Sequence, residues 1–369
     1  MGRGYRTPVR VLHLYRPALP GTRAQTVQVL HTCHALASRG HEVWLLANRA
    51  RGAPADVDTI LADHGLAPVP TLHLQLAPSA WSPAASAWFR WTLATWCDAA
   101  TRDSVVYARE LKYLGPVGER PRVVYEAHCL EKQRAAEEED EPGVTEAWER
   151  AMLARCNALV TNSGGTLAAL EAAYGAALPA LRRVVHNATA ADRVAPAPPR
   201  EPSARPCVVY AGSARAYKGV AALVEAFADL PQFDLELVGD TWPGPLPPNV
   251  RAGGPLPYPA LPARLAAAAA LVLPLEDNSF GRQFTSPLKL WDYLATGRPI
   301  VAADLPTVRE IAGDRPFYYP PGDRPGLAAA LGRAVAAGHG EPRVRTWADR
   351  AAEIEAVLAE VVARPRSAR

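Results

Sequence analysis

The sequence predicts an α/β protein with two doubly wound, Rossmann-like domains. Two stretches, at 9–36 and 208–230, each run from a short apolar strand through a tight loop into an amphipathic helix. Repeated alternation of strand and helix is typical of parallel sheets covered by helices. A stretch rich in Pro and Ala at 191–206 lacks apolar periodicity, so we predict an inter-domain linker there. With 369 residues, the chain is long enough for two hydrophobic cores.

The N-terminal domain is predicted to span 1–190. Its first strand is Val9–Leu14, after which a capping box of Thr22 and Gln25 opens a helix that Gly40 ends. Further strands are predicted at Val43–Ala47, Leu72–Leu76, Val105–Ala108, Val123–Glu126, Ala158–Thr161 and Val184–His186, with helices at Thr145–Arg155 and Thr166–Tyr174.

The C-terminal domain is predicted to span 207–345. Its strands are expected at Val208–Ala211, Phe233–Val238, Leu271–Leu275 and from Pro299 onward, with helices at Val220–Leu230, Leu261–Ala269 and 286–296. A C-terminal helix at 346–369 ends the chain, and packing back on the N-terminal domain is one option for it. Ligands of such sheets bind beyond the carboxyl ends of the strands, so we expect the site in a cleft between the two domains.

Composition excludes several classes of protein. The formal net charge is +3 and 49% of the residues are hydrophobic, which favours a globular protein and argues against nucleic acid as a partner. No apolar run approaches ~18 residues, and the N-terminus lacks a signal-peptide layout. The five cysteines are scattered and form no C-x-x-C pair, as in cytoplasmic proteins. We therefore expect a cytoplasmic protein.

The stretch 285–311 contains a candidate anion site. Ser286 is a predicted N-cap and Pro287 suits the first helical position, so the N–H groups of Leu288 and its neighbours would point at a ligand. Lys289 adds an ammonium group to this positive helix end, as a phosphate site requires. Asp292 lies on the same side of the helix. The alternative is an ordinary capped helix with a surface pair of Lys289 and Asp292.

A second candidate anion site lies after the first strand of the C-terminal domain. Only four of the 40 basic residues are lysines, and one of them, Lys218, stands at the start of the next helix. The preceding loop contains Gly212 and Arg215, which also suit a phosphate. Together, Lys218 and Lys289 predict one diphosphate held from two sides. The alternative for Lys218 is a solvated loop lysine.

Other residues allow more than one interpretation. His128 follows a buried strand directly, where catalytic groups often lie, although a buried structural histidine is the alternative. Asp56 and Asp58 form a D-x-D pattern that binds metal–nucleotide in some sugar transferases, or they simply start a helix. An aromatic run predicts core packing, with an interfacial surface for a lipid-linked acceptor as the rival: Trp81, Trp88, Phe89, Trp91 and Trp96.

At these motifs the chain resembles the retaining GT-B glycosyltransferases of the group 1 (family 4) type, over nearly its whole length. LPGTRAQTVQVLHTCHALASRGHEVWLLA resembles the first βαβ unit of the family, whose loop, here with Gly21, faces the donor phosphate. VVYEAH gives His128 the place of the histidine at the donor sugar. YAGSARAYKGV resembles the phosphate-binding loop and assigns Lys218 to the diphosphate. The frequent arginine of the family is Ser213 here, so that half of the diphosphate clamp is either absent or supplied by Arg215.

The segment SPLKLWDYLATGRPIVAADLPTVREI matches the family pattern S-P-x-K-x-x-E-Y-M-A-x-G-x-P-I-V-A best. The resemblance implies that Ser286–Lys289 bind the diphosphate and that Asp292, in place of the usual glutamate, binds the ribose. The E-x7-E pattern of the family would need a glutamate at Phe284. The residues predicted at the donor sugar are Asp277, Arg282 and Phe284 itself, with Glu276 and Asn278 as further candidates.

The resemblance implies a GT-B architecture and a retaining glycosyltransferase. The enzyme would move a sugar from a nucleotide-diphosphate donor to an acceptor hydroxyl of a glycan, a lipid-linked saccharide or a small natural product, as in polysaccharide biosynthesis. His128, Lys218 and Lys289 would be catalytic, with no metal or other cofactor. Peripheral contact with the inner face of the membrane is one option. The alternatives are a nucleotide-sugar epimerase and a non-catalytic sugar-nucleotide-binding homologue.

Overall fold

The computed structural model describes residues 8–21, 23–53, 56–77, 82–101, 103–118, 121–138, 143–190, 205–215 and 218–365. The chain forms two compact units. The N-terminal unit comprises 1–162, 166–185 and 347–369, and the C-terminal unit comprises 163–165 and 186–346. The chain therefore enters the C-terminal unit at His186, before the predicted boundary at residue 190. The predicted linker at 191–206 lies, except for its last two residues, outside the described residues.

The N-terminal unit is built on a parallel sheet with the strand order β2-β3-β1-β5-β6-β7-β8, and β4 pairs with β3. The strands are β1 (Arg10–Leu14), β2 (Ala18–Leu19), β3 (Glu42–Arg49), β4 (Leu72–Ala77), β5 (Ser104–Ala108), β6 (Arg122–Ala127), β7 (Ala158–Thr161) and β8 (Leu181–Val184). The helices are α1 (Ala24–Ser38), α2 (Val57–Asp63), α3 (Pro83–Asp98), α4 (Glu131–Glu138), α5 (Glu146–Leu153), α6 (Gly164–Tyr174) and α12 (Trp347–Ala363).

Two predicted details of this unit need correction. Helix α1 begins at Ala24 with Arg23 at the N-cap and no side-chain cap, and Thr22 of the predicted capping box lies outside the described residues. The strand predicted at Val184–His186 is β8, which ends at Val184 because the chain leaves the sheet there.

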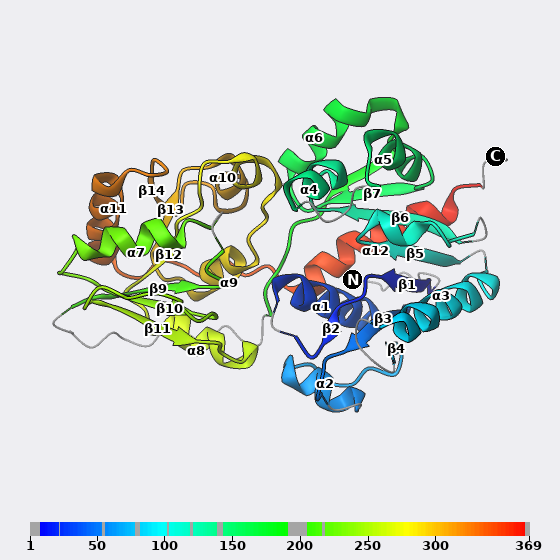
Figure 1. Cartoon of the computed structure of the whole chain (residues 1–369), viewed down its shortest axis with the longest axis horizontal. Coiled ribbons are helices and arrows are strands. Elements are labelled where there is room, and N and C mark those ends of the chain that lie inside the picture. Colours follow the sequence, from blue (N-terminus) through cyan, green and yellow to red (C-terminus); the bar gives the residue numbers. More distant parts are fainter. Residues whose placement is uncertain are drawn as a thin grey trace, which may run out of the picture. The chain divides into compact units, whose positions relative to one another are not determined.

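The last helix of the chain, α12, packs against α1 (Figure 1). The indole ring of Trp347 stacks on the imidazole ring of His31 with 5.4 Å between the centroids. Arg350 donates from Nε to the Thr32 hydroxyl at 3.2 Å. Arg350, which is fully buried, also donates from Nη2 to Oε1 of Glu126 at 2.7 Å, so it lies beside the carboxyl-terminal half of β6.

The C-terminal unit holds a second parallel sheet with the order β11-β10-β9-β12-β13-β14. The strands are β9 (Cys207–Ala211), β10 (Asp234–Val238), β11 (Val250–Gly254), β12 (Ala270–Leu273), β13 (Ile300–Ala303) and β14 (Phe317–Tyr319). The helices are α7 (Val220–Ala228), α8 (Leu261–Ala266), α9 (Leu288–Thr296), α10 (Pro306–Ala312) and α11 (Arg324–Ala337). The two parallel sheets with their helices confirm the predicted fold class.

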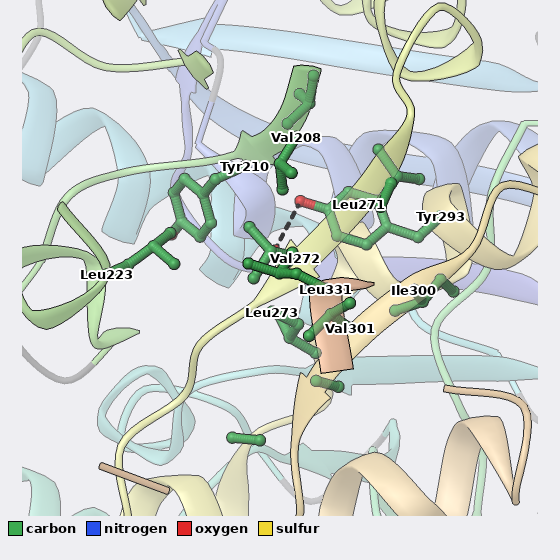
Figure 2. Close-up of a cluster of buried hydrophobic side chains, with 14 of the residues drawn as sticks. Val208, Tyr210, Leu223, Leu271, Val272, Leu273, Tyr293, Ile300, Val301 and Leu331 are labelled. Carbon is green, nitrogen blue, oxygen red and sulfur yellow. Dashed lines mark hydrogen bonds between the residues drawn. The ribbon is translucent and has the colours of Figure 1, made fainter. Parts of the chain in front are cut away.

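Helix α9 is anchored to the core of this unit through Tyr293 (Figure 2). The buried Tyr293 hydroxyl accepts the N–H of Ala211 at 2.8 Å and lies 3.4 Å from the carbonyl oxygen of Val272. The helix is thereby pinned to β9 and β12. This anchor fixes the first turn of α9, and with it Lys289, beside the end of β9.

Candidate functional site

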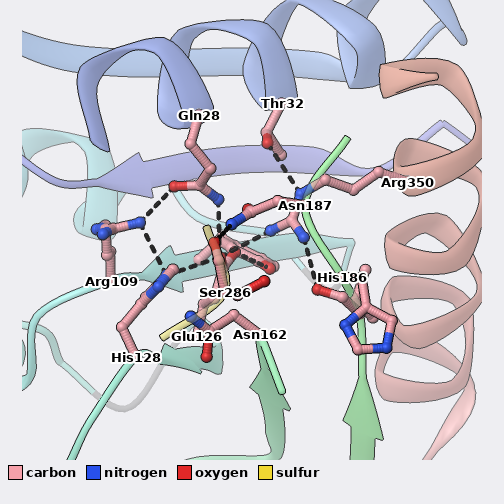
Figure 3. A network of polar contacts seen from close by, with 12 residues as sticks. Gln28, Thr32, Arg109, Glu126, His128, Asn162, His186, Asn187, Ser286 and Arg350 are labelled. Carbon is pink, nitrogen blue, oxygen red and sulfur yellow. Dashed lines mark hydrogen bonds and ion pairs between the residues drawn. The ribbon is translucent and has the colours of Figure 1, made fainter. Parts of the chain in front are cut away.

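Two groups of polar residues, one in each unit, coincide with the predicted site residues. In the N-terminal unit, His128 follows β6 and its Nε2 atom lies 2.9 Å from Oε1 of Glu126 (Figure 3). The same Nε2 atom lies 2.8 Å from Nη1 of Arg109. Arg109 also donates to Oε1 of Gln28, which extends from α1. His128 is therefore held from two sides by side chains of opposite charge.

Glu126 is the centre of this group. It is 1% exposed and accepts from Gln28 Nε2 at 2.7 Å, Arg350 Nη2 at 2.7 Å and the Tyr107 hydroxyl at 2.5 Å. Burial alone would raise the pKa of Glu126, but the Arg350 guanidinium and His128 together hold that pKa well below its usual range. Glu126 is thus a buried carboxylate that keeps its charge.

His128 is neutral near pH 7. Burial, reinforced by the Arg109 guanidinium, lowers the pKa of His128 to about 4, although Glu126 acts in the opposite direction. Its side chain is 19% exposed. A neutral imidazole at the end of a strand can exchange one hydrogen bond with a ligand, as a donor or as an acceptor.

In the C-terminal unit, the first turn of α9 differs from the prediction by one residue. Pro287, with ψ 114°, is the N-cap, and Ser286 lies outside the helix. No side chain forms a capping hydrogen bond at this helix start. The Ser286 hydroxyl and the Lys289 ammonium are buried and have no hydrogen-bond partner in the described part of the chain. An unpaired polar group is costly to bury, so a ligand that binds both would remove that cost.

The Lys289 ammonium lies over the ring of Tyr210, 3.8 Å from its centroid. Burial, together with the nearby Lys218 ammonium, lowers the pKa of Lys289 well below its usual value. Lys218 donates to the Ser213 hydroxyl at 2.5 Å, and burial, with Arg215 close by, lowers the pKa of Lys218 to about 8. The two predicted lysines therefore repel each other at one place, which is the electrostatic condition of an anion site.

Gly212 makes room for the Lys289 ammonium. A Cβ atom on Gly212 would lie 2.7 Å from Lys289 Nζ, and the backbone there has φ +131°. The Gly212 N–H group donates to the carbonyl oxygen of Val238 at 2.7 Å. That N–H is already bonded, so Gly212 acts on the site through the space that it leaves open.

The other predicted site residues lie outside the groups around His128 and Lys289 or make different contacts from those expected. Oδ1 of Asp292 accepts from the Thr189 hydroxyl at 2.7 Å, and Lys289 makes no hydrogen bond to it, so the alternative Lys289–Asp292 surface pair is wrong. Asp277 and Arg282 pair with each other on the surface at 2.6 Å, whereas Phe284 is 4% exposed. At Gly21, a Cβ atom would lie 2.6 Å from the carbonyl oxygen of Ala18.

The D-x-D motif acts as a helix cap. Asp56 is the N-cap of α2 and accepts the N–H of Thr59 at 2.8 Å, in agreement with the helix-start interpretation. Over the described ranges, no group of three or more His, Cys, Asp and Glu side chains could hold a metal ion. None of the described helices is long and apolar enough to cross a membrane.

Sequence reasoning missed most of the charged group around His128. Arg350 is distant in sequence and lies in a helix with no motif. Glu126 carried a usable signal, because it is the one charged residue in the apolar strand sequence VVYEA just before His128. A charge inside a buried strand requires a partner, which could have prompted a search for one.

Two family models match the chain. Residues 25–193 match the model of Glycosyltransferase Family 4, and residues 205–337 match that of Glycosyl transferases group 1. A search of curated protein sequences finds no match.

The fold is similar to those of several solved structures. Sucrose-phosphate synthase from Thermosynechococcus elongatus has a TM-score of 0.66 at 18% identity, over 96% of this chain and 94% of that chain. The catalytic domain of starch synthase IV from Arabidopsis thaliana, bound to ADP and acarbose, has a TM-score of 0.68 at 12% identity, over 97% and 100%. The pneumococcal O-GlcNAc transferase GtfA, in complex with UDP and GlcNAc, has a TM-score of 0.67 at 8% identity, over 97% and 100%. At these identities the likeness is one of fold.

Proposed function

Because the chain belongs to the GT-B glycosyltransferases of the family 4 and group 1 type, we propose that it is a retaining enzyme that uses a nucleotide-diphosphate sugar as donor. The acceptor would be a hydroxyl group of a glycan, a lipid-linked saccharide or a small natural product. Two of the similar structures contain nucleoside diphosphates, ADP in starch synthase IV and UDP in GtfA, which supports this donor class.

The observation that carries the proposal is the buried ammonium of Lys289, which lies near Lys218 and without a hydrogen-bond partner among the described residues. Burial disfavours an uncompensated ammonium, which is why the pKa of Lys289 lies well below its usual value. A diphosphate would supply the missing negative charge. As the bond between sugar and diphosphate breaks, negative charge grows on the leaving group, and both ammonium groups would stabilise it.

The proposed chemistry needs no protein nucleophile. The bond from the anomeric carbon to the diphosphate oxygen breaks, and the acceptor oxygen attacks on the same face of the sugar. The acceptor proton passes to the departing phosphate. Glu126, the carboxylate beside His128, is buried and accepts hydrogen bonds from several donors, so it is unsuited to attack a sugar. This observation supports a retaining mechanism without a covalent intermediate.

We assign the other contacts by the same logic. Asp292 would bind the ribose of the donor, with Thr189 holding one of its oxygens in place. His128 would contact the donor sugar. The ammonium groups of Lys218 and Lys289 would take the place of a metal ion at the diphosphate, so we propose metal-independent activity.

A donor panel tests the proposal. The full-length protein is incubated with UDP-, GDP-, ADP- and dTDP-sugars and with candidate acceptors, and release of nucleoside diphosphate is followed with and without EDTA. We expect release with one donor class, unaffected by EDTA, and a product with the anomeric configuration of the donor. Binding of a donor without turnover, in the presence of all acceptor classes, would contradict the proposal that the protein is an enzyme. A nucleotide sugar recovered with an epimerised sugar, without net release of nucleoside diphosphate, would indicate the nucleotide-sugar epimerase instead.

A further inference from the structure

The Nε2 atom of His128 has two neighbours, of which one favours a proton on Nε2 and the other favours an unprotonated Nε2. Glu126 Oε1, at 2.9 Å, can only accept a hydrogen bond, whereas Arg109 Nη1, at 2.8 Å, can only donate one. In a neutral imidazole a single proton resides on either Nε2 or Nδ1. The two neighbours therefore favour opposite tautomers, and the tautomer decides whether Nδ1 meets a ligand as acceptor or as donor.

The difference in burial between Glu126 and Arg109 decides which of the two tautomers is favoured. Glu126 is 1% exposed, so water cannot replace a hydrogen bond that it lacks. Arg109 is only half-buried, and its Nη1 atom also donates to Gln28. A bare lone pair on His128 facing a buried carboxylate therefore costs more than one unused N–H of a partly solvated guanidinium.

The arrangement around Glu126 agrees with this choice. Oε1, the oxygen that faces His128, also accepts from Gln28 and Arg350, and Oε2 accepts from the Tyr107 hydroxyl. A lone pair on Nε2 would lie 2.9 Å from this charged oxygen and be repelled by it, whereas a proton on Nε2 is attracted to it. The other ring nitrogen, Nδ1, has no hydrogen-bond partner among the described residues, and the His128 side chain is partly exposed.

We propose that Glu126 is a positioning residue that fixes His128 in the tautomer with its proton on Nε2, so that Nδ1 accepts a hydrogen bond from a sugar hydroxyl. Arg350 of α12 keeps Glu126 ionised, which makes the last helix of the chain part of the sugar-recognition apparatus. The inference rests on the proposed function for the identity of the ligand. It goes further by naming the kind of group that His128 recognises: a hydroxyl that donates.

The first test uses nuclear magnetic resonance and needs no substrate. In the ¹⁵N-labelled full-length protein at pH 7, the His128 ring nitrogens are assigned by comparison with His128→Asn, and the protonated one is identified from its shifts. We expect the proton on Nε2. A proton on Nδ1 would overturn the inference, because Arg109 would then control the ring.

Two variants remove the two neighbours of Nε2 separately. Arg109→Met should keep the proton on Nε2, because Glu126 remains. The double variant Glu126→Met with Arg350→Met removes both buried charges at once, which avoids an unpaired ion, and should move the proton to Nδ1. A double variant that folds and keeps the Nε2 proton would overturn the inference. If the double variant fails to fold, the wild-type and Arg109→Met spectra still decide.

The third test concerns the substrate. Deoxyfluoro sugars accept hydrogen bonds but cannot donate them. For each protein, the rate of transfer from a deoxyfluoro analogue of the donor is compared with the rate from the parent donor. For one of the analogues, this loss of rate should be about tenfold larger in the wild type than in the double variant. Equal discrimination by both proteins would overturn the role in recognition. A wild-type ring with its proton on Nε2 in a protein that transfers no sugar would contradict the proposed function and leave the positioning of His128 intact.

Discussion

The ammonium group of Lys289 is buried without a hydrogen-bond partner in the described part of the chain, and Lys218 lies close enough to lower its pKa. Such a residue reduces stability, because burial and the neighbouring ammonium both disfavour its charged form until an anion binds. A residue that is costly to the fold and suited to an anion is expected at a functional site.

Lys289→Met should therefore separate activity from stability. We expect turnover to fall about 10²–10³-fold, because one group that stabilises the leaving charge is lost. The thermal midpoint should stay equal or rise, since an apolar side chain suits the buried position. Lys132→Met, which removes an exposed ammonium 3.2 Å from Glu146, is the matched control and should change neither quantity. Wild-type turnover in Lys289→Met would remove this residue from the mechanism.

Asp292→Asn should mainly weaken donor binding. The amide keeps an oxygen for the Thr189 hydroxyl but loses the negative charge that strengthens a bond to ribose. Calorimetric titration with the nucleoside diphosphate product should give an affinity about tenfold lower. Asp277→Asn is the control. Asp277 is a candidate contact of the donor sugar, and the nucleoside diphosphate has no donor sugar, so its affinity should not change in this variant. An unchanged affinity in Asp292→Asn would mean that Asp292 only anchors Thr189.

At the scale of elements, the turn after β9 and the start of α9 form one arrangement. The turn passes so close to α9 that the space for the Lys289 ammonium exists only because residue 212 is glycine. Tyr210 of β9 supports that ammonium from the other side, while Tyr293 ties α9 to β9 and β12. The site therefore depends on the register between a strand and a helix that are far apart in the sequence.

Gly212→Ala tests this arrangement. The new methyl group would meet Lys289 Nζ at 2.7 Å, and the backbone at φ +131° disfavours any side chain, so we expect lower activity and lower stability. Gly254→Ala in the same unit is the control, because its φ is also positive, at +72°, but a Cβ atom there meets nothing within 4 Å. That control should lose stability and keep its activity. Equal activity losses in both variants would contradict a direct effect on Lys289.

At the scale of the whole molecule, buried histidines should make the protein sensitive to acid. Burial lowers the pKa of His13 to about 3 and that of His128 to about 4, against 6.5 for an unperturbed histidine. Below pH 6.5 the unfolded chain binds protons that the folded chain does not, so the free energy of unfolding falls as the pH is lowered from 6.5 towards 4. Glu126, whose pKa is lowered, acts in the same direction at still lower pH.

His13→Leu should reduce this sensitivity. Both ring nitrogens of His13 are buried without a hydrogen-bond partner among the described residues, so an apolar side chain of similar size should be tolerated at pH 7. Urea unfolding of the full chain between pH 6 and 4.5 should show a slope lower by about 1.4 kcal/mol per pH unit, the value for one proton. An unchanged slope would mean that His13 is protonated in the folded protein.

The local patterns of the sequence were sufficient for much of the fold. Strand-length apolar runs and 3–4 spacing located β1, β5, β6 and β7, because these signals lie within a few residues of each other. The start of α9 was misplaced by one residue, since Ser286 and Pro287 both suit a helix start and only the backbone angle at Pro287 separates them.

The sequence by itself determined the two-domain α/β architecture, the glycosyltransferase family and the two lysines, because each depends on short motifs and local periodicity. Only the tertiary structure decided that Lys289 is buried against Tyr210 and that Arg350 is paired with Glu126, 224 positions away. Burial and charge pairing depend on segments that meet only in the folded chain, so no local pattern encodes them. The same is true of His128. Its position after a strand was visible in the sequence, whereas the two neighbours of its Nε2 atom are Arg109, directly after β5, and Glu126 of β6, which are held in turn by α1 and α12.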